Sequence, residues 1–272
     1  MKTILLALLL VIITGAGALS QNFEGTIIWK VTTEMDAATK AQMDEAQKKM
    51  NDPETQAQIK AMKEKMNDPQ FKQMMESNPQ MKAQMEQMLK MTEGGNINSM
   101  MPTGFVLKMK DQNTLTKMEG GMMANFEVLY LKNKNTSYRI DREAKTYSVM
   151  SLEGMDTVKV SDVKVTKTGE TAKILNYTCT KYIAESTIQG RKVQQFFWTT
   201  KDIKGLDMKS LAQQQAGNKN QHALFYSKIE GVPLKMEMKQ PEMTMIMEAT
   251  EVKKQSLPAS DFAIPAGYKE VK

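Results

Sequence analysis

The sequence predicts a mainly β (α+β) domain: an open antiparallel sheet that carries a methionine-rich helical insert after its first strand. Two patterns predict the sheet. Apolar and polar residues alternate over Asn22–Glu34, and short β-prone runs separated by polar turns follow from Gly104 onward. The insert is predicted by a block from Met35 to Met101 that holds 13 of the 26 methionines.

The first 20 residues have the three parts of a secretory signal peptide. Lys2 supplies the charge, Ile4–Ile13 is apolar throughout, and Ala18-Leu19-Ser20 offers the small residues that a signal peptidase reads. We expect cleavage after Ser20 and a periplasmic or secreted protein with one β-rich domain over residues 21–272. No run is long enough to span a membrane, so at most a peripheral contact with the envelope is expected. The oligomeric state stays open.

The first strand shows the clearest alternation in the chain. One face carries Phe23, Ile27, Trp29 and Val31, and the other face is polar. Later strands are expected at residues 105–110, 122–132, 136–141, 145–151, 173–186 and 192–200, with a final hairpin across Gln240-Pro241-Glu242. Helix signals are missing between most of these runs, which favours an antiparallel meander.

The insert, residues 35–95, repeats a short motif. Met50-Asn51-Asp52-Pro53 returns as Met66-Asn67-Asp68-Pro69, and Asn78-Pro79 echoes it. An aspartate before a proline suits a helix N-cap followed by proline at the first helical position. We therefore expect two or three short helices with sharp turns between them.

Methionines at regular spacing mark two candidate binding surfaces. In the insert, the residues at helical spacing and their apolar neighbours are Met62, Met66, Phe71, Met74, Met75, Met81, Met85, Met88 and Leu89. In the final hairpin, alternation would put five methionines on one face if the register aligns them: Met236, Met238, Met243, Met245 and Met247. The two surfaces can face one another, pack the insert onto its own sheet, or share a hydrophobic ligand.

Other function classes find less support. The net charge is +6, but lysines alternate with apolar residues and no arginine cluster occurs, which argues against nucleic acid as a partner. His222 is the only histidine and no Gly-x-Ser-x-Gly motif exists, so we expect neither an enzyme nor a cofactor. The only cysteine, Cys179, excludes an intramolecular disulfide and is expected to be buried in a strand.

A soft metal is the competing interpretation of the methionines. Thioether sulfur suits Cu(I), and Met62-x-x-x-Met66 and Met81-x-x-x-Met85-x-x-Met88 have spacings that can converge. The alternative function is therefore a Cu(I)-binding or oxidant-buffering methionine-rich protein.

The β part resembles a family of exported bacterial proteins of unknown function whose fold is similar to that of the lipoprotein carriers LolA and LolB. The resemblance covers residues 22–34 and 103–272. It rests on FEGTIIWKV, GETAKILNYTCTKY, FFWTTKDI, GVPLKMEM and LPASDFAIPAGYKEV. It implies an open, strongly curved half-barrel with an apolar concave face, which in those carriers receives acyl chains.

The insert resembles the Asp-Pro helical repeats of Hop/Sti-type co-chaperones and of ubiquilin, through NDPETQAQI and NDPQFKQMMESNPQM. That resemblance implies a groove for exposed hydrophobic segments. Together these patterns predict an exported, non-enzymatic, carrier- or chaperone-like protein that binds a lipid, an acyl chain or an apolar protein segment.

Overall fold

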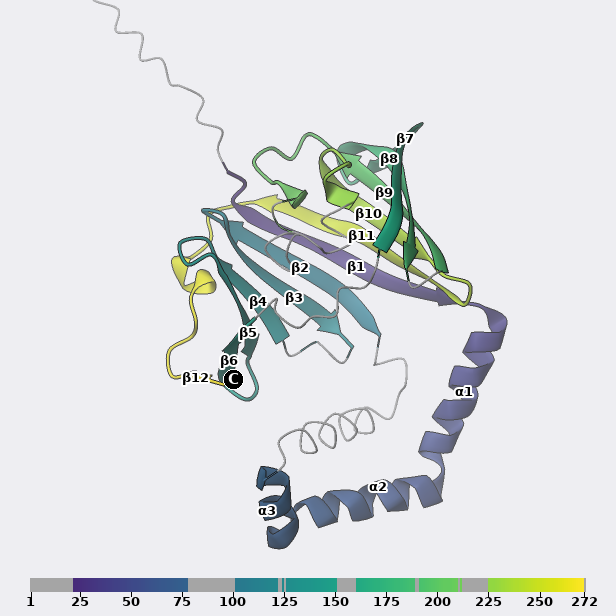
Figure 1. The fold of residues 1–272 in the computed structure, drawn as a ribbon, viewed down its shortest axis with the longest axis vertical. Coiled ribbons are helices and arrows are strands. Elements are labelled where there is room, and N and C mark those ends of the chain that lie inside the picture. The colour runs from purple at the N-terminus through teal and green to yellow at the C-terminus, as the bar shows by residue number, and fades with distance from the viewer. Residues whose placement is uncertain are drawn as a thin grey trace, which may run out of the picture.

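A computed structural model describes residues 22–77, 101–121, 124, 126–150, 160–188, 191–209, 211 and 225–271. The strands in these ranges form one sheet in the order β12-β6-β5-β4-β3-β2-β1-β11-β10-β9-β8-β7. All neighbours pair antiparallel except β12 and β6. The sheet is curved and does not close (Figure 1). The predicted mainly β class with an open antiparallel sheet is confirmed.

The strand bounds are β1 (Gly25–Met35), β2 (Pro102–Lys110), β3 (Asn113–Gly120), β4 (Phe126–Leu131), β5 (Thr136–Asp141), β6 (Thr146–Val149), β7 (Val160–Ile174), β8 (Tyr177–Ile188), β9 (Arg191–Thr200), β10 (Val232–Lys239), β11 (Met243–Lys254) and β12 (Lys269–Glu270).

Strand β1 lies in the middle of the sheet, between β2 and β11. Figure 1 shows this purple strand beside the yellow β11, so the two ends of the domain meet there. The alternation read from the sequence holds, because Ile27 and Trp29 are almost fully buried while Lys30 is exposed. The Trp29 indole N–H also donates to the Pro233 carbonyl oxygen at 3.2 Å, which ties β1 to the start of β10.

The insert begins directly after β1 and contains α1 (Ala37–Asn51), α2 (Pro53–Met66) and α3 (Pro69–Ser77). The two Asp-Pro starts are confirmed. Pro53 follows the N-cap Asp52, and the Asp68 carboxylate accepts from the backbone amides of Gln70 and Phe71. Asn78-Pro79 lies outside the described residues. None of the described helices is long and apolar enough to cross a membrane.

The described helices extend away from the sheet (Figure 1). Neither α1 nor α2 contains a buried residue. A backbone bond from the Asp36 N–H to the Glu242 carbonyl oxygen, 3.1 Å, fixes the base of the insert to the hairpin between β10 and β11. These helices therefore do not pack onto their own sheet, which was one of the interpretations of the methionine spacing.

Two strands depart from the sequence-based prediction. No strand was expected at β3, and most of β7 was missed. The run expected over residues 173–186 is instead the end of β7, a turn, and β8, because Leu175 adopts a positive φ of 52°. Asp111 and Gln112 likewise turn β2 into β3 with φ of 50° and 63°. Neither turn contains the glycine that usually marks such a conformation.

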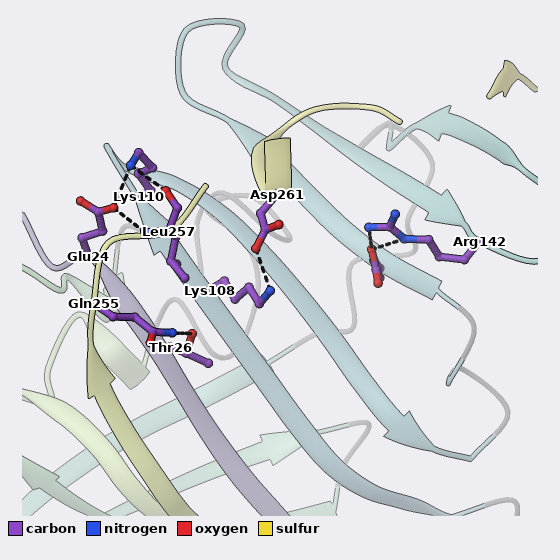
Figure 2. Close-up of polar contacts among 9 residues, drawn as sticks. Glu24, Thr26, Lys108, Lys110, Arg142, Gln255, Leu257 and Asp261 are labelled. Carbon is purple, nitrogen blue, oxygen red and sulfur yellow. Dashed lines mark hydrogen bonds and ion pairs between the residues drawn. The ribbon is translucent and has the colours of Figure 1, made fainter. Parts of the chain in front are cut away.

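The C-terminal segment packs across the β2–β6 half of the sheet. Leu257 and Phe262 are buried against Leu115, Leu129 and Ile140. Polar contacts hold the segment in place (Figure 2). The Glu24 carboxylate accepts from the Lys110 ammonium and from the Leu257 backbone amide, both at 2.8 Å, and Lys108 pairs with Asp261 at 2.7 Å. Glu24, just before β1, thus holds the C-terminal segment at Leu257 against the sheet.

Candidate hydrophobic-ligand site

The final hairpin has the register that the alternating methionines require. Met236 pairs with Met247, and Met238 pairs with Met245. Directly paired residues on antiparallel strands point to the same face. The five hairpin methionines therefore share one face, as expected. Strand β1 adds a sixth, because Met35 lies opposite Met243.

These six residues form what we call the methionine strip: Met35, Met236, Met238, Met243, Met245 and Met247. All six are partly exposed. Four of the six methionines lie in two rows that run across five strands. The first row is Tyr182, Phe197, Met236, Met247 and Val31, and the second is Ala184, Gln195, Met238, Met245 and Thr33.

The strip extends the buried core toward the end of β1. Phe197, in the first row, is 1% exposed, and Trp29, two residues before Val31 on β1, is also 1% exposed. Beyond the second row the strip ends at Met35 and Met243, where the chain leaves the sheet. An apolar surface therefore runs without a break from the core to a partly exposed end.

The rows carry no charge between β8 and β1, because the charges of the hairpin lie on the opposite face. On β7 the first row continues to Lys167, opposite Tyr182, and the second row continues to Val165. On the opposite face, Lys235 pairs with Glu248 at 3.1 Å and lies over the Trp198 ring, with its ammonium 5.3 Å from the centroid. Lys239 lies over Phe196 at 4.9 Å. The two faces of this part of the sheet thus differ sharply in polarity.

One end of the strip is covered by the segment that precedes β10. Phe225 is buried, and Tyr226 packs edge-on against Phe197 with ring centroids 5.8 Å apart. The Tyr226 hydroxyl donates to the Met236 sulfur at 3.4 Å. Burial raises the pKa of Tyr226, so the phenol stays protonated and remains a donor. Met236 therefore lies at the closed end of the strip.

The insert carries a second, separate hollow. A groove of about 620 Å³ lies between α2 and α3, and its lining includes Phe71 and Met74 among polar neighbours. Met74 is 45% exposed. Met62 and Met66 are partly exposed but do not line the groove. The Met75 side chain and all of Met81, Met85, Met88 and Leu89 lie outside the described part of the chain.

The family model of a domain of unknown function, DUF4412, matches residues 73–268. The chain belongs to the DUF4412 family. The predicted membership of an uncharacterised family is confirmed, whereas the likeness to LolA and LolB stays a prediction. The match begins inside α3 and includes β10 and β11 with their five methionines.

Other comparisons add little to this DUF4412 membership. No curated protein matches the chain. A solved structure of PNGF-II in space group C2 matches at 18% sequence identity with a TM-score of 0.26, over 59% of this chain and 28% of that chain. The chain therefore spans little more than a quarter of the PNGF-II chain, and so slight a likeness supports no inference about fold or function.

The lone cysteine of this DUF4412 chain is shielded from solvent. Cys179 is fully buried in β8, as predicted. Burial, followed by the nearby negative charge of Asp202, raises the pKa of its thiol to about 11. Within the described residues, no three His, Cys, Asp or Glu side chains gather at a distance suited to a metal ion. His222 lies outside that part of the chain.

Sequence reasoning missed the part of the site that comes from other strands. Met35 joins the strip, and Thr33 and Gln195 lie beside it, because β1 and β9 flank the hairpin. Local periodicity does not encode the order of the strands. The period-2 pattern of β1 does place Val31, Thr33 and Met35 on one face. The sequence does not show that β1 pairs with β11, and this pairing is what brings that face beside the hairpin methionines.

Proposed function

We propose that this is an exported, non-enzymatic binding protein whose methionine strip holds the acyl chain of a lipid. The supporting observation is the strip itself: six partly exposed methionines on one face that continue the core, with no charged residue paired beside them on the same face. A signal peptide over residues 1–20 and a periplasmic location are part of the same proposal, as is the resemblance to the LolA and LolB carriers.

The physics of methionine suits this role. Its unbranched, polarizable side chain fits apolar ligands of different shape without loss of contact. Each buried methylene of a ligand contributes roughly 0.8 kcal/mol, so an acyl chain that buries six of them gains about 5 kcal/mol before the cost of association. A partly exposed strip also leaves the ligand free to leave again, which a carrier requires.

The groove between α2 and α3 can serve an apolar protein segment, because it combines Phe71 and Met74 with a polar rim. The proposal gives the acyl chain to the strip, since the strip is continuous with the core and the groove is not. The insert starts at the open end of the strip, so both surfaces can act on one amphiphilic partner.

A soft metal is the second candidate, and the hairpin register favours it specifically. The cross-strand pairs Met236–Met247 and Met238–Met245 bring four thioethers side by side on one face. Thioether ligands suit Cu(I) and fit harder divalent ions poorly. This candidate uses the same residues through their sulfur atoms, so variants that keep shape but remove sulfur separate the two functions.

The test compares two double variants at one cross-strand pair. Met238→Leu with Met245→Leu keeps volume and polarity, so binding of a fluorescent acyl probe should stay within a few-fold of wild type. Met238→Gln with Met245→Gln places two amides against the ligand, each at a cost of roughly 1–3 kcal/mol, and should weaken binding at least tenfold. Met43→Gln with Met50→Gln, the same change in α1, should have no effect.

The outcomes separate the candidates. Cu(I) binding that is lost in the Leu double variant as fully as in the Gln one, together with no acyl-probe binding by wild type, would establish the soft-metal function instead. Acyl binding that is equal in wild type and in the Met238/Met245 Gln variant would place the ligand elsewhere and overturn the proposal.

A further inference from the structure

One polar atom beside the methionine strip, on the same face of the sheet, lacks a hydrogen bond. The Thr33 hydroxyl oxygen is buried, and it has no partner among the residues that the structure describes. A buried hydroxyl without a partner loses its bond to water and gains nothing in return, which destabilises the fold. Such a group in a candidate site therefore needs an explanation.

The position of Thr33 explains why the sheet does not satisfy it. The pairing of β1 with β2 ends at Lys30 and Gly104, so Thr33 has a paired neighbour only on β11 within the described residues. That neighbour is Met245, whose thioether cannot donate a hydrogen bond and accepts one only weakly, and no hydrogen bond joins it to the Thr33 hydroxyl. The same row contains Gln195, a polar residue only 4% exposed. Polar groups thus flank the Met238–Met245 pair on both sides.

The surroundings select the chemistry of a ligand that would pair with Thr33. A pure hydrocarbon offers no acceptor. A free carboxylate beside Thr33 would bring a charge into the second row, which contains no lysine or arginine from Val165 on β7 to Thr33 on β1. An unpaired charge in apolar surroundings is strongly disfavoured. A neutral carbonyl oxygen accepts from the hydroxyl and brings no charge.

We propose that the Thr33 hydroxyl donates a hydrogen bond to the carbonyl oxygen of a neutral acyl ester or amide whose chain lies along the methionine strip. This inference rests on the proposed acyl binding. The carbonyl lies in the second row, one residue pair from the end of β1, and the chain runs toward Met236 and Phe197. The Met245 side chain, opposite Thr33 in the register, can adjust when the ligand enters, because it has three rotatable bonds.

The test uses three probes of equal chain length on the whole protein: a fatty acid methyl ester, the alkane, and the free fatty acid at pH 8. Wild type should bind the ester about fivefold more tightly than the alkane, the size expected of one net hydrogen bond. It should bind the carboxylate more weakly than the ester.

Two variants assign that preference to Thr33. Thr33→Val keeps the shape and removes the hydroxyl, so the ester should fall to the affinity of the alkane while the alkane is unaffected. Thr33→Ser should keep the preference for the ester. Thr32→Val, on the opposite and exposed face, is the matched control and should change nothing. Thermal unfolding should show Thr33→Val at least as stable as wild type, because the buried hydroxyl without a partner is gone.

The results distinguish this inference from the function on which it rests. If wild type binds the ester and the alkane equally, or if Thr33→Val keeps the ester preference, the role of Thr33 is wrong while acyl binding stands. A carboxylate that binds as tightly as the ester overturns the neutral ligand class. If wild type binds none of the three probes, the proposed function fails and this inference fails with it.

Discussion

Met35 on β1 lies directly opposite Met243 on β11, and the chain leaves the sheet at the next residue. The Asp36 N–H then bonds to the Glu242 carbonyl oxygen at 3.1 Å. The methionine strip and the base of the methionine-rich insert therefore share one end of the sheet (Figure 1). Under the proposed function, a ligand that enters the strip from this end would meet the insert first, so the insert could influence binding without covering the sheet.

Removal of the insert should leave the sheet folded. Strands β1 and β2 are antiparallel neighbours, so a short Gly-Ser linker in place of residues 37–95 can join them as a hairpin. Helices α1 and α2 contribute no buried side chain, so their removal costs the sheet little apolar contact. Far-ultraviolet circular dichroism should show a β-rich spectrum, and thermal unfolding should stay cooperative. A shortened protein without a cooperative transition would show that the insert belongs to the core.

Glu24 should make stability depend on acid pH. Its hydrogen bond with Lys110, followed by that with the Leu257 amide, lowers the pKa of the carboxyl below its ordinary value of about 4.5. A carboxyl with a lowered folded-state pKa adds stability above the unfolded-state pKa and loses it as the pH falls through the folded-state value.

The measurement is denaturant unfolding between pH 7 and pH 3. Wild type should lose its stability advantage over Glu24→Gln as the pH falls below about 4.5. The exposed Glu251 on the neighbouring strand β11 provides the control variant, Glu251→Gln. If the free energy of unfolding of wild type and of Glu24→Gln differs by a constant amount over this range, the ionised Glu24 carboxylate does not stabilise the fold through Lys110 and Leu257.

Arg142 should stabilise the fold mainly because its partner, the Glu127 carboxylate, is buried. Its guanidinium donates twice to one oxygen of Glu127, at 2.8 and 2.6 Å, and the Glu127 side chain is only 10% exposed (Figure 2). Arg142→Met should lower the free energy of unfolding by about 1–2 kcal/mol, since it leaves that carboxylate without its charged partner. The double variant with Glu127→Gln should recover part of the loss. If the double variant is less stable than Arg142→Met, the buried charge is not the cause.

Cys179 should be nearly inert in the folded protein. A pKa of about 11 reduces the thiolate fraction at pH 8 about a hundredfold relative to an ordinary cysteine, and burial blocks access as well. Alkylation by iodoacetamide should be slow in buffer and fast in denaturant. The neighbouring Thr178 is exposed, so Thr178→Cys in a Cys179→Ala background should react readily. Rapid native labelling at Cys179 would contradict its burial.

The local features of the domain follow from short-range patterns. The alternation around Trp29, the helix starts at Asp52-Pro53 and Asp68-Pro69, and the methionine face of the hairpin each depend on residues a few positions apart. Backbone periodicity, capping and turn chemistry act over that distance, so the sequence is enough to predict them. The sequence did not predict the turns at Asp111-Gln112 and at Leu175, because these residues adopt a positive φ without glycine.

The composition of the site depended on the tertiary structure. Thr33 and Met245 are separated by more than 200 residues, and only the pairing of the first strand with β11 makes them neighbours. The same pairing adds Met35 to the strip, and β9 adds Gln195 and Phe197. Periodicity shows which face of a strand is apolar, but it carries no information about which strand lies alongside. The sequence determined that the hairpin has a methionine face; the order of the strands decided that this face includes a buried hydroxyl.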